Sequence, residues 1–154
     1  MAEADHAWVL GLNAAHVSET GPLDQAGLDA LLATACHATV AGPEAGFLIA
    51  IDAATAHDGL NFRWFAARMD DFVYVDRIVV AAAARRRGIA AALYADLAGA
   101  ALALGRRALV AEVNIDPPNP GSLAFHARGR FHAVGEAHLA ERGKTVRYLR
   151  KELA

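Results

Sequence analysis

The feature that most constrains this fold is a strand, a helix and a second strand that follow one another. Phe72–Val80 is a run of apolar and β-branched residues broken by a single charged pair, which is typical of a buried strand. A helix is predicted over Arg85–Leu104 and another strand over Ala108–Asn114. This order predicts two parallel strands joined by a right-handed crossover.

The predicted helix superficially resembles a membrane span. Gly88–Gly105 contains only one charged residue, Asp96. That aspartate would cost about 2.5–3.5 kcal/mol inside a bilayer, and alanine is too weakly apolar to offset the cost. The larger apolar residues recur at helical spacing, so we expect a core helix and no membrane partner. These residues are Ile89, Leu93, Leu97 and Leu104.

Further elements surround this unit and predict a mixed α/β fold (an α+β mixed sheet) in one domain, residues 1–154. We expect helices over Pro22–Ala35 and Asn119–Ala127 and a long connection over Ala53–Asp71. Further strands are expected over Trp8–Asn13, His37–Ala41, Phe47–Asp52, Phe131–His138 and Thr145–Lys151.

Composition and charge narrow the function classes. Apolar residues make up 55% of the 154 residues, which excludes a largely disordered chain. A net charge of −2 disfavours a general nucleic-acid binder. The first 84 residues are acidic and the remainder basic, which fits either two different ligands or two differently solvated surfaces.

The single cysteine, Cys36, rules out a disulfide within the chain and lies among small residues, so we expect it to pack. The histidines show no clustering of the kind that metal sites need, so no metal is expected. The acidic start Met1–Asp5 does not resemble a signal peptide, and a cytoplasmic location is the expectation.

The loop between the first strand and the helix has the features of an anion site. It reads Arg85-x-x-Gly88-x-Ala90, and the N–H groups at a helix N-terminus carry partial positive charge. Small residues let phosphate oxygens approach the backbone, and arginines add charged hydrogen bonds. A solvated helix start or a basic patch for nucleic acid are the alternatives.

Two motifs in sequence order resemble the GNAT superfamily of acyl-CoA-dependent N-acyltransferases. The first is the Arg85-x-x-Gly88-x-Ala90 turn, which is similar to the Q/R-x-x-G-x-G/A loop, with Val80 five residues before it. The second is Asn119–Phe131, which is similar to N-x-x-S/A-x-x-F/L-Y-x-x-x-G-F. Together they cover a little over a third of the chain.

The resemblance implies a central mixed, mostly antiparallel sheet with flanking helices, in which the parallel strand pair splays apart around acetyl-CoA. It implies that Ile78–Val80 pair with pantetheine and that the loop holds the pyrophosphate. The residues carried over as cofactor-binding are Ile78, Val79, Val80, Arg85, Arg86, Arg87, Gly88, Ile89, Ala90, Ala91, Asn119, Ser122 and Phe125.

Glu112 is the first candidate for the general base. It is a lone acid among small and apolar residues of a strand, and desolvation raises a carboxyl pKa toward the useful range. Some family members that modify protein N-termini look similar here. The alternative is a structural carboxylate bonded to an arginine.

Asp76 is the second candidate, as a base or as a binder of a cationic acceptor. It shares a strand face with Tyr74, which aligns with a glutamate base of other family members. The alternative for Asp76 is an ion pair, with the neighbourhood of Arg77 or a basic residue across the sheet.

His126 stands where the family carries a tyrosine, next to Phe125. An imidazolium can protonate the thiolate of coenzyme A, whose thiol pKa is about 8.5, or bond to its sulfur. The alternative is a packed histidine without a proton role.

The acceptor side is expected to involve the early helix and the Ala53–Asp71 connection. Asn61, Trp64, Phe65 and Tyr74 offer polar groups and an aromatic wall for a cationic amine. The alternative is that Trp64 and Phe65 anchor the connection to the core.

The sequence therefore predicts acetyl transfer from acetyl-CoA to a primary amine, on a small molecule or a protein, by direct attack. The alternative functions are a non-catalytic acyl-CoA-binding sensor, which the missing tyrosine suggests, and a nucleic-acid binder, which the net charge disfavours. A homodimer follows from family analogy alone.

Overall fold

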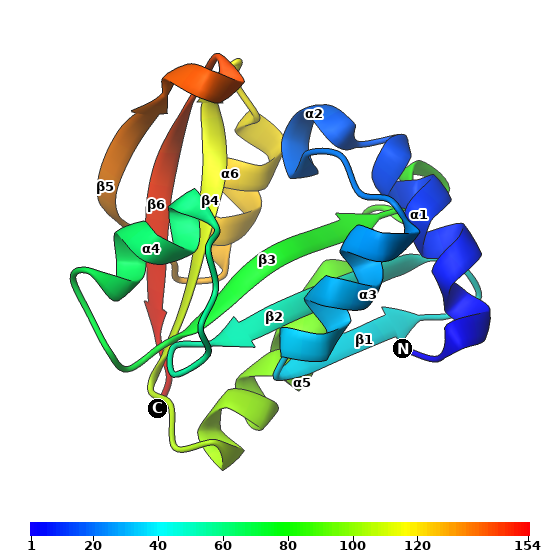
Figure 1. The fold of residues 1–154 in the computed structure, drawn as a ribbon, viewed down its shortest axis with the longest axis horizontal. Helices are drawn as coiled ribbons and strands as arrows, with labels where there is room; N and C mark the ends of the chain where they lie inside the picture. Colours follow the sequence, from blue (N-terminus) through cyan, green and yellow to red (C-terminus); the bar gives the residue numbers. More distant parts are fainter.

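The computed structural model describes residues 1–154 and is built around one six-stranded sheet (Figure 1). The strand order is β1-β2-β3-β4-β6-β5, and only β3 and β4 are parallel. The predicted mixed, mostly antiparallel sheet is therefore confirmed. The strands are β1 (His37–Ala41), β2 (Gly46–Asp52), β3 (Val73–Val80), β4 (Ala108–Asp116), β5 (His132–Leu139) and β6 (Lys144–Glu152).

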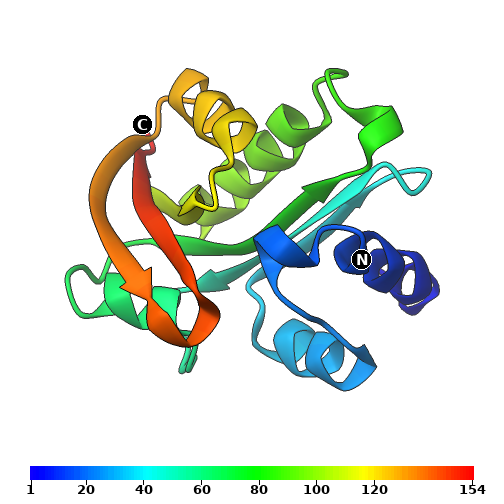
Figure 2. The same ribbon diagram turned by 90° about the horizontal axis from the view of Figure 1, so that it is seen from above.

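Helices cover both faces of the sheet (Figure 2). Helices α1 and α3 pack on one face, where α4 also buries two phenylalanines, and α5 and α6 lie on the other. No helix combines the length and apolar character needed to cross a bilayer. The helices are α1 (His6–Ala14), α2 (Val17–Thr20), α3 (Gln25–Thr34), α4 (Leu60–Ala66), α5 (Ile89–Ala103) and α6 (Pro120–Arg128), with 3₁₀ turns at Glu3–Asp5, Ala82–Ala84 and Ala140–Arg142.

The strand predicted over Trp8–Asn13 is wrong, because this segment lies within helix α1. Val9 and Asn13, four residues apart, are its fully buried positions, which is the spacing of one helix face. The amide of buried Asn13 is satisfied on both sides: its Nδ2 donates to Gly21 O, and its Oδ1 accepts from Arg77. Tertiary contacts that a local pattern does not contain therefore stabilise this helix.

Helix α5 begins at Ile89, four residues later than predicted. Arg86 and Gly88 have positive φ angles of 60° and 79°, so the chain turns sharply before it becomes helical. The predicted strand, loop, helix and strand are otherwise present.

The parallel strands separate after a short contact. Val73 pairs with Leu109 and Tyr74 with Val110, and no further pairs join β3 to β4. A bulge in β3 accompanies the separation, since Val75 and Arg77 pair with adjacent residues of β2 and leave Asp76 between them. The predicted splayed pair is confirmed, and the gap opens toward the C-terminal ends of both strands.

An ion pair closes the other end of this gap. Asp52, at the end of β2, accepts from Arg106 Nε at 2.8 Å and from Arg106 Nη2 at 2.7 Å. Arg106 lies two residues before the start of β4, and the Asp52 and Arg106 side chains are only 14% and 24% exposed. The pair therefore ties β2 to the start of β4, beside the two positions where β3 and β4 still pair.

Replacing Arg106 with alanine should lower the free energy of unfolding at pH 7 by about 1–2 kcal/mol, since two charged hydrogen bonds are lost from a partly hydrated site. Hydrogen bonds from Arg106 lower the pKa of Asp52. The contribution is therefore present above the unfolded-state pKa of about 3.9 and is lost as pH falls through the folded value.

Urea denaturation of both proteins between pH 2 and pH 7 checks this. Arg107→Ala is the matched control, because the neighbouring side chain makes no ion pair. A stability difference that stays constant over this pH range would contradict the assignment.

Candidate active site

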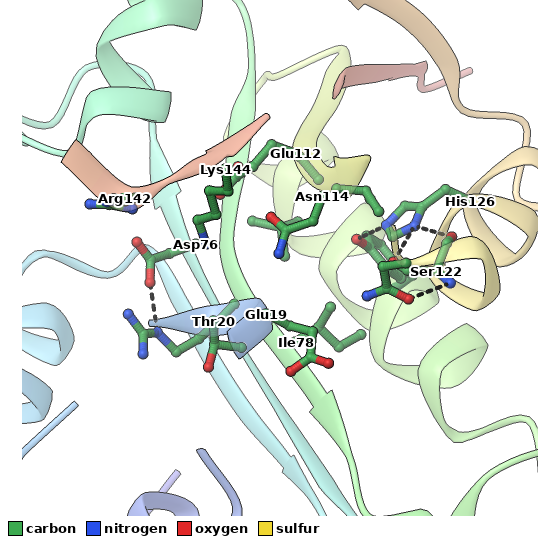
Figure 3. Close-up of a pocket in the computed structure, with 16 residues that line it drawn as sticks. Glu19, Thr20, Asp76, Ile78, Glu112, Asn114, Ser122, His126, Arg142 and Lys144 are labelled. Atoms are coloured by element: carbon green, nitrogen blue, oxygen red, sulfur yellow. Dashed lines mark hydrogen bonds and ion pairs between the residues drawn. The ribbon is translucent and has the colours of Figure 1, made fainter. Parts of the chain in front are cut away.

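Three adjoining cavities pass through the gap between β3 and β4. A helix-side cavity of about 600 Å³ lies between the end of β3, the start of α5 and α6. A small gap cavity of about 100 Å³ follows (Figure 3), and a hairpin-side cavity of about 710 Å³ lies beside α2 and the β5–β6 turn. Ser122 and His126 line the first two, whereas Asp76 and Glu112 line the last two. A ligand on either side can therefore approach the same point between the strands.

Glu112 lies at this junction, on β4, and its carboxylate is held by one oxygen. Its Oε1 accepts from Asn61 Nδ2 at 2.7 Å and from Tyr74 OH at 3.1 Å. Tyr148 OH donates in turn to Asn61 Oδ1 at 3.0 Å, which fixes the amide orientation. Glu112 Oε2 is buried and has no hydrogen-bond partner in the protein. The network orients the carboxylate and leaves one oxygen for a ligand.

The surroundings of Glu112 raise the pKa of its carboxyl group toward neutral pH. Burial raises its pKa to about 7, the nearby charge of Asp76 adds to the rise, and the bonds from Tyr74 and Asn61 partly oppose it. No arginine is bonded to Glu112, so the alternative of a structural carboxylate paired with arginine does not match the geometry.

Asp76 points into the same region but is already paired. Its Oδ2 accepts from Arg77 Nε at 2.7 Å, and its Oδ1 lies 3.8 Å from His57 Nε2. Arg77 also donates to Asn13 Oδ1 at 2.9 Å. The expected alternative, an ion pair with Arg77, is therefore present, and Asp76 has fewer free lone pairs than Glu112.

His126 does not have the features of the expected imidazolium. It is 4% exposed, and burial lowers its pKa. Its Nδ1 lies 2.8 Å from the carbonyl oxygen of Ser122, which can only accept, so Nδ1 carries the hydrogen. Nε2 then accepts from Tyr94 OH at 2.8 Å. The histidine is a neutral acceptor, and Tyr94, which the sequence did not single out, lines the gap cavity beside it.

The residues predicted to bind the cofactor gather around the helix-side cavity. The exception is Arg87, whose exposed side chain does not line it, so its role in binding stays a prediction. The other twelve predicted residues line the cavity: Ile78, Val79, Val80, Arg85, Arg86, Gly88, Ile89, Ala90, Ala91, Asn119, Ser122 and Phe125.

The start of α5 presents free hydrogen-bond donors to this cavity. The backbone N–H groups from Arg86 to Ala91 have no acceptor within the protein. A Cβ added at Gly88 would meet no atom within 4 Å, so the backbone is open to a ligand there. Arg85 is held at the rim, donating to His16 Nε2 at 2.8 Å, while His16 Nδ1 lies 3.0 Å from Leu12 O. The site fits a diphosphate.

The expected aromatic wall of the acceptor side is corrected. Asn61 and Tyr74 line the hairpin-side cavity, but Phe65 is fully buried in the core and Trp64 stacks on Tyr148 at 4.0 Å. The alternative, in which Trp64 and Phe65 anchor the connection, matches these contacts. Their alternation with polar residues did not distinguish the two cases.

Residues from two other segments complete the cavities. Thr20 of α2 lines all three, and Arg142 and Lys144 of the β5–β6 turn line the hairpin-side and gap cavities. The connection between the strands predicted over Phe131–His138 and Thr145–Lys151 was the only sequence signal for Arg142 and Lys144. Cys36 takes no part, since burial raises the pKa of its thiol to about 11.

Comparison with known proteins agrees with this geometry. The model of the Acetyltransferase (GNAT) family matches residues 28–130. No curated protein matches the sequence. Among solved structures, Ard1 from Thermoplasma volcanium is similar over 100% of this chain and 95% of its own, with a TM-score of 0.77 and 15% identity.

Two other solved structures show the same fold. An N-acetyltransferase from Staphylococcus aureus Mu50 has a TM-score of 0.71 and 19% identity over 100% of this chain and 96% of its own. An acetyltransferase from Bacillus anthracis str. Ames, in complex with acetyl coenzyme A, has a TM-score of 0.54 and 17% identity over 70% of this chain and 55% of its own. Because the family model matches well over half of the residues, the chain belongs to the GNAT family of acetyltransferases.

Proposed function

We propose that this protein transfers an acetyl group from acetyl-CoA to a primary amine by direct attack within a ternary complex. The observation that carries the proposal is the position of Glu112. Glu112 lines both the gap cavity and the hairpin-side cavity, and its buried Oε2 has no partner. A base at this junction can reach an amine on one side that attacks a thioester on the other.

The helix-side cavity supports acetyl-CoA as the donor. Free N–H groups at the start of α5 and the side chains of Arg85 and Arg86 suit the pyrophosphate. Beyond Tyr74, β3 has no partner on the β4 side, so backbone groups of Ile78–Val80 are free to pair with pantetheine. The Bacillus anthracis protein of the same fold was solved with this ligand.

Glu112 performs the proton chemistry in this proposal. Bound acetyl-CoA supplies the electrophilic carbonyl and a thiolate leaving group, so that a C–N bond forms as the C–S bond breaks. Glu112 Oε2 takes the proton that the amine must lose, and Asn61 and Tyr74 hold the carboxylate in place through Oε1. Its pKa of about 7 lets it accept that proton near neutral pH.

Tyr94 and His126 are placed to assist the departing sulfur. Burial raises the pKa of Tyr94 and lowers that of His126, so the hydroxyl stays protonated and the imidazole stays neutral. The single hydrogen of the Tyr94 hydroxyl is donated to His126 Nε2 in the structure, and we propose that it turns to the sulfur when acetyl-CoA is bound. The histidine then acts as a positioning residue rather than as the acid itself.

Glu112→Gln should lower kcat by about 10²-fold or more, because a general base contributes that much in typical enzymes. In the wild type, kcat should rise with pH and level off above about 7 as Glu112 loses its proton, and the variant should lose this limb. Stopped-time thiol-release assays between pH 5.5 and 9 measure it, with the surface variant Glu136→Gln as control. An unchanged pH profile would remove Glu112 as the base.

Gly88→Val should weaken coenzyme A binding at least tenfold, because the new side chain occupies the open space beside the α5 amides. The positive φ of Gly88 also costs a valine about 1–2 kcal/mol of stability. Gly105→Val is the matched control. It lies at the other end of the same helix, with a similar φ of 76° and no atom within 4 Å of the added Cβ.

Isothermal calorimetry of the two variants separates lost binding from backbone strain. The proposed pyrophosphate loop predicts weak binding only in Gly88→Val. Equal affinities in both variants would argue against that loop.

Tyr94→Phe should lower kcat by about 10²-fold or less, since a thiolate with a pKa near 8.5 leaves without much assistance. The affinity for coenzyme A should stay within a few-fold. If Tyr94 and His126 act as one unit, the double variant with His126→Phe should be no slower than the slower single variant. Additive losses would show that the two residues act separately.

A non-catalytic acyl-CoA-binding module is the second candidate, favoured by the neutral histidine at position 126. Calorimetry and the thiol-release assay distinguish the two functions. Binding of acetyl-CoA without turnover on any amine would support the sensor.

A further inference from the structure

The charges around the hairpin-side cavity are unbalanced. Its charged lining consists of two acids and three cations, Asp76, Glu112, Arg77, Arg142 and Lys144. Asp76 and Arg77 neutralise each other through their 2.7 Å ion pair. In this cavity one carboxylate, Glu112, then remains against two cations, and Glu19 faces the same two cations only from the adjoining gap cavity.

Arg142 and Lys144 have no counter-ion in the protein. Neither side chain takes part in a salt bridge or a hydrogen bond to another residue. In Figure 3 they lie with Asp76 on the side of Glu112 away from His126 and Ser122. Both cations therefore face the acceptor side of the passage rather than the pyrophosphate loop.

Lys144 is half-buried, which makes the missing counter-ion more costly than for a surface lysine. Burial and the nearby charge of Arg142 both lower its pKa, while Glu112 and Glu19 oppose that shift. The two like charges repel each other, and an anion bound between them would offset this repulsion.

This arrangement argues against the plain cationic amine that the expected acceptor-side residues suggested. A simple ammonium would enter a cavity with two free cations and one half-protonated carboxylate. An amine that also carries a negative group would meet Glu112 with one end and the two cations with the other.

We propose that the acceptor is a small zwitterionic molecule, an amine bearing a carboxylate or similar anionic group, whose anion binds between Arg142 and Lys144. The proposal rests on the proposed acetyl transfer and names its substrate class. The amine lies toward Glu112 Oε2, and the anion toward the β5–β6 turn.

The test compares matched acceptors with the full-length protein. Each set holds a free amino acid with its α-amine or a side-chain amine, the corresponding primary amide, and the amine without the carboxyl group. Aminoalkyl phosphonates form a further arm, which distinguishes a carboxylate from a phosphonate as the anion. We expect kcat/KM to be at least about tenfold higher for the anionic member of a set, as for a charged hydrogen bond.

Variants of Arg142 and Lys144 test whether these two residues cause the preference for an anionic acceptor. Arg142→Gln and Lys144→Gln should each raise KM for the anionic acceptor about tenfold and reduce its advantage over the amide. Lys144→Glu should reverse the preference. Lys151→Gln is the control, on the same strand but outside the cavity. Coenzyme A affinity should stay unchanged in all four, since none of the residues lines the helix-side cavity.

The outcomes separate this inference from the proposed function. Acetylation of amides and plain amines as fast as of their anionic partners would overturn the zwitterion while leaving acetyl transfer intact. A preference for the anionic acceptor that survives in both glutamine variants would also overturn the zwitterion. Acetylation confined to peptides with a neutral residue beside the amine would overturn it as well. Failure of every amine despite binding of acetyl-CoA would instead overturn the proposed transfer and this inference with it.

Discussion

Two parallel strands that share only two residue pairs govern the arrangement of everything else in this molecule. Where β3 and β4 part, each has a backbone edge without a neighbour, and buried polar backbone is costly unless it is paired. The Asp52–Arg106 pair ties β2 to the start of β4 on one side of this point, and the Tyr74–Glu112 hydrogen bond joins β3 to β4 on the other. A ligand that supplies strand-like hydrogen bonds would complete the sheet.

The same opening sets the electrostatics of Glu112. A carboxylate on a central strand is surrounded by protein, so burial is the largest cause of its raised pKa. The hydroxyl of Tyr74 and the amide of Asn61 limit the rise, and both come from the helix α1 face of the sheet. Deep burial without these two donors would keep the group protonated, and exposure without burial would leave it a weak base.

Local sequence patterns predicted the unit of β3, loop, α5 and β4 correctly. The apolar run of β3, the turn around Gly88 and the helix after it are determined within short stretches of chain, and the cofactor-side residues follow from them. The acceptor side depends on contacts between distant segments. Asn61 meets Glu112, and Lys144 lies beside Arg142 at a cavity whose other wall is α2, so no window of sequence contains the site.

The wrong strand prediction over Trp8–Asn13 also arises from contacts between distant segments. The short apolar run around Trp8 fits a strand as well as a helix, and the hydrogen bonds from Asn13 to Gly21 and from Arg77 to Asn13 stabilise the helix. His126 shows a different limit: its residue type suggested an acid, but the Ser122 carbonyl fixes its tautomer, so that its Nε2 accepts from Tyr94, thirty-two positions earlier.

The extra residue at Asp76 has a consequence for how this chain can vary in length. Tyr74 and Val79 both pack into the core on the α1 side although an odd number of steps separates them, which strict alternation would forbid. Deleting one residue between them would leave four steps, which regular alternation accommodates, so Ile78 and Val79 would keep their faces while the bulge was lost. A single insertion beside the retained bulge would instead exchange the faces of Ile78 and Val79, so this strand tolerates a shorter chain better than a longer one.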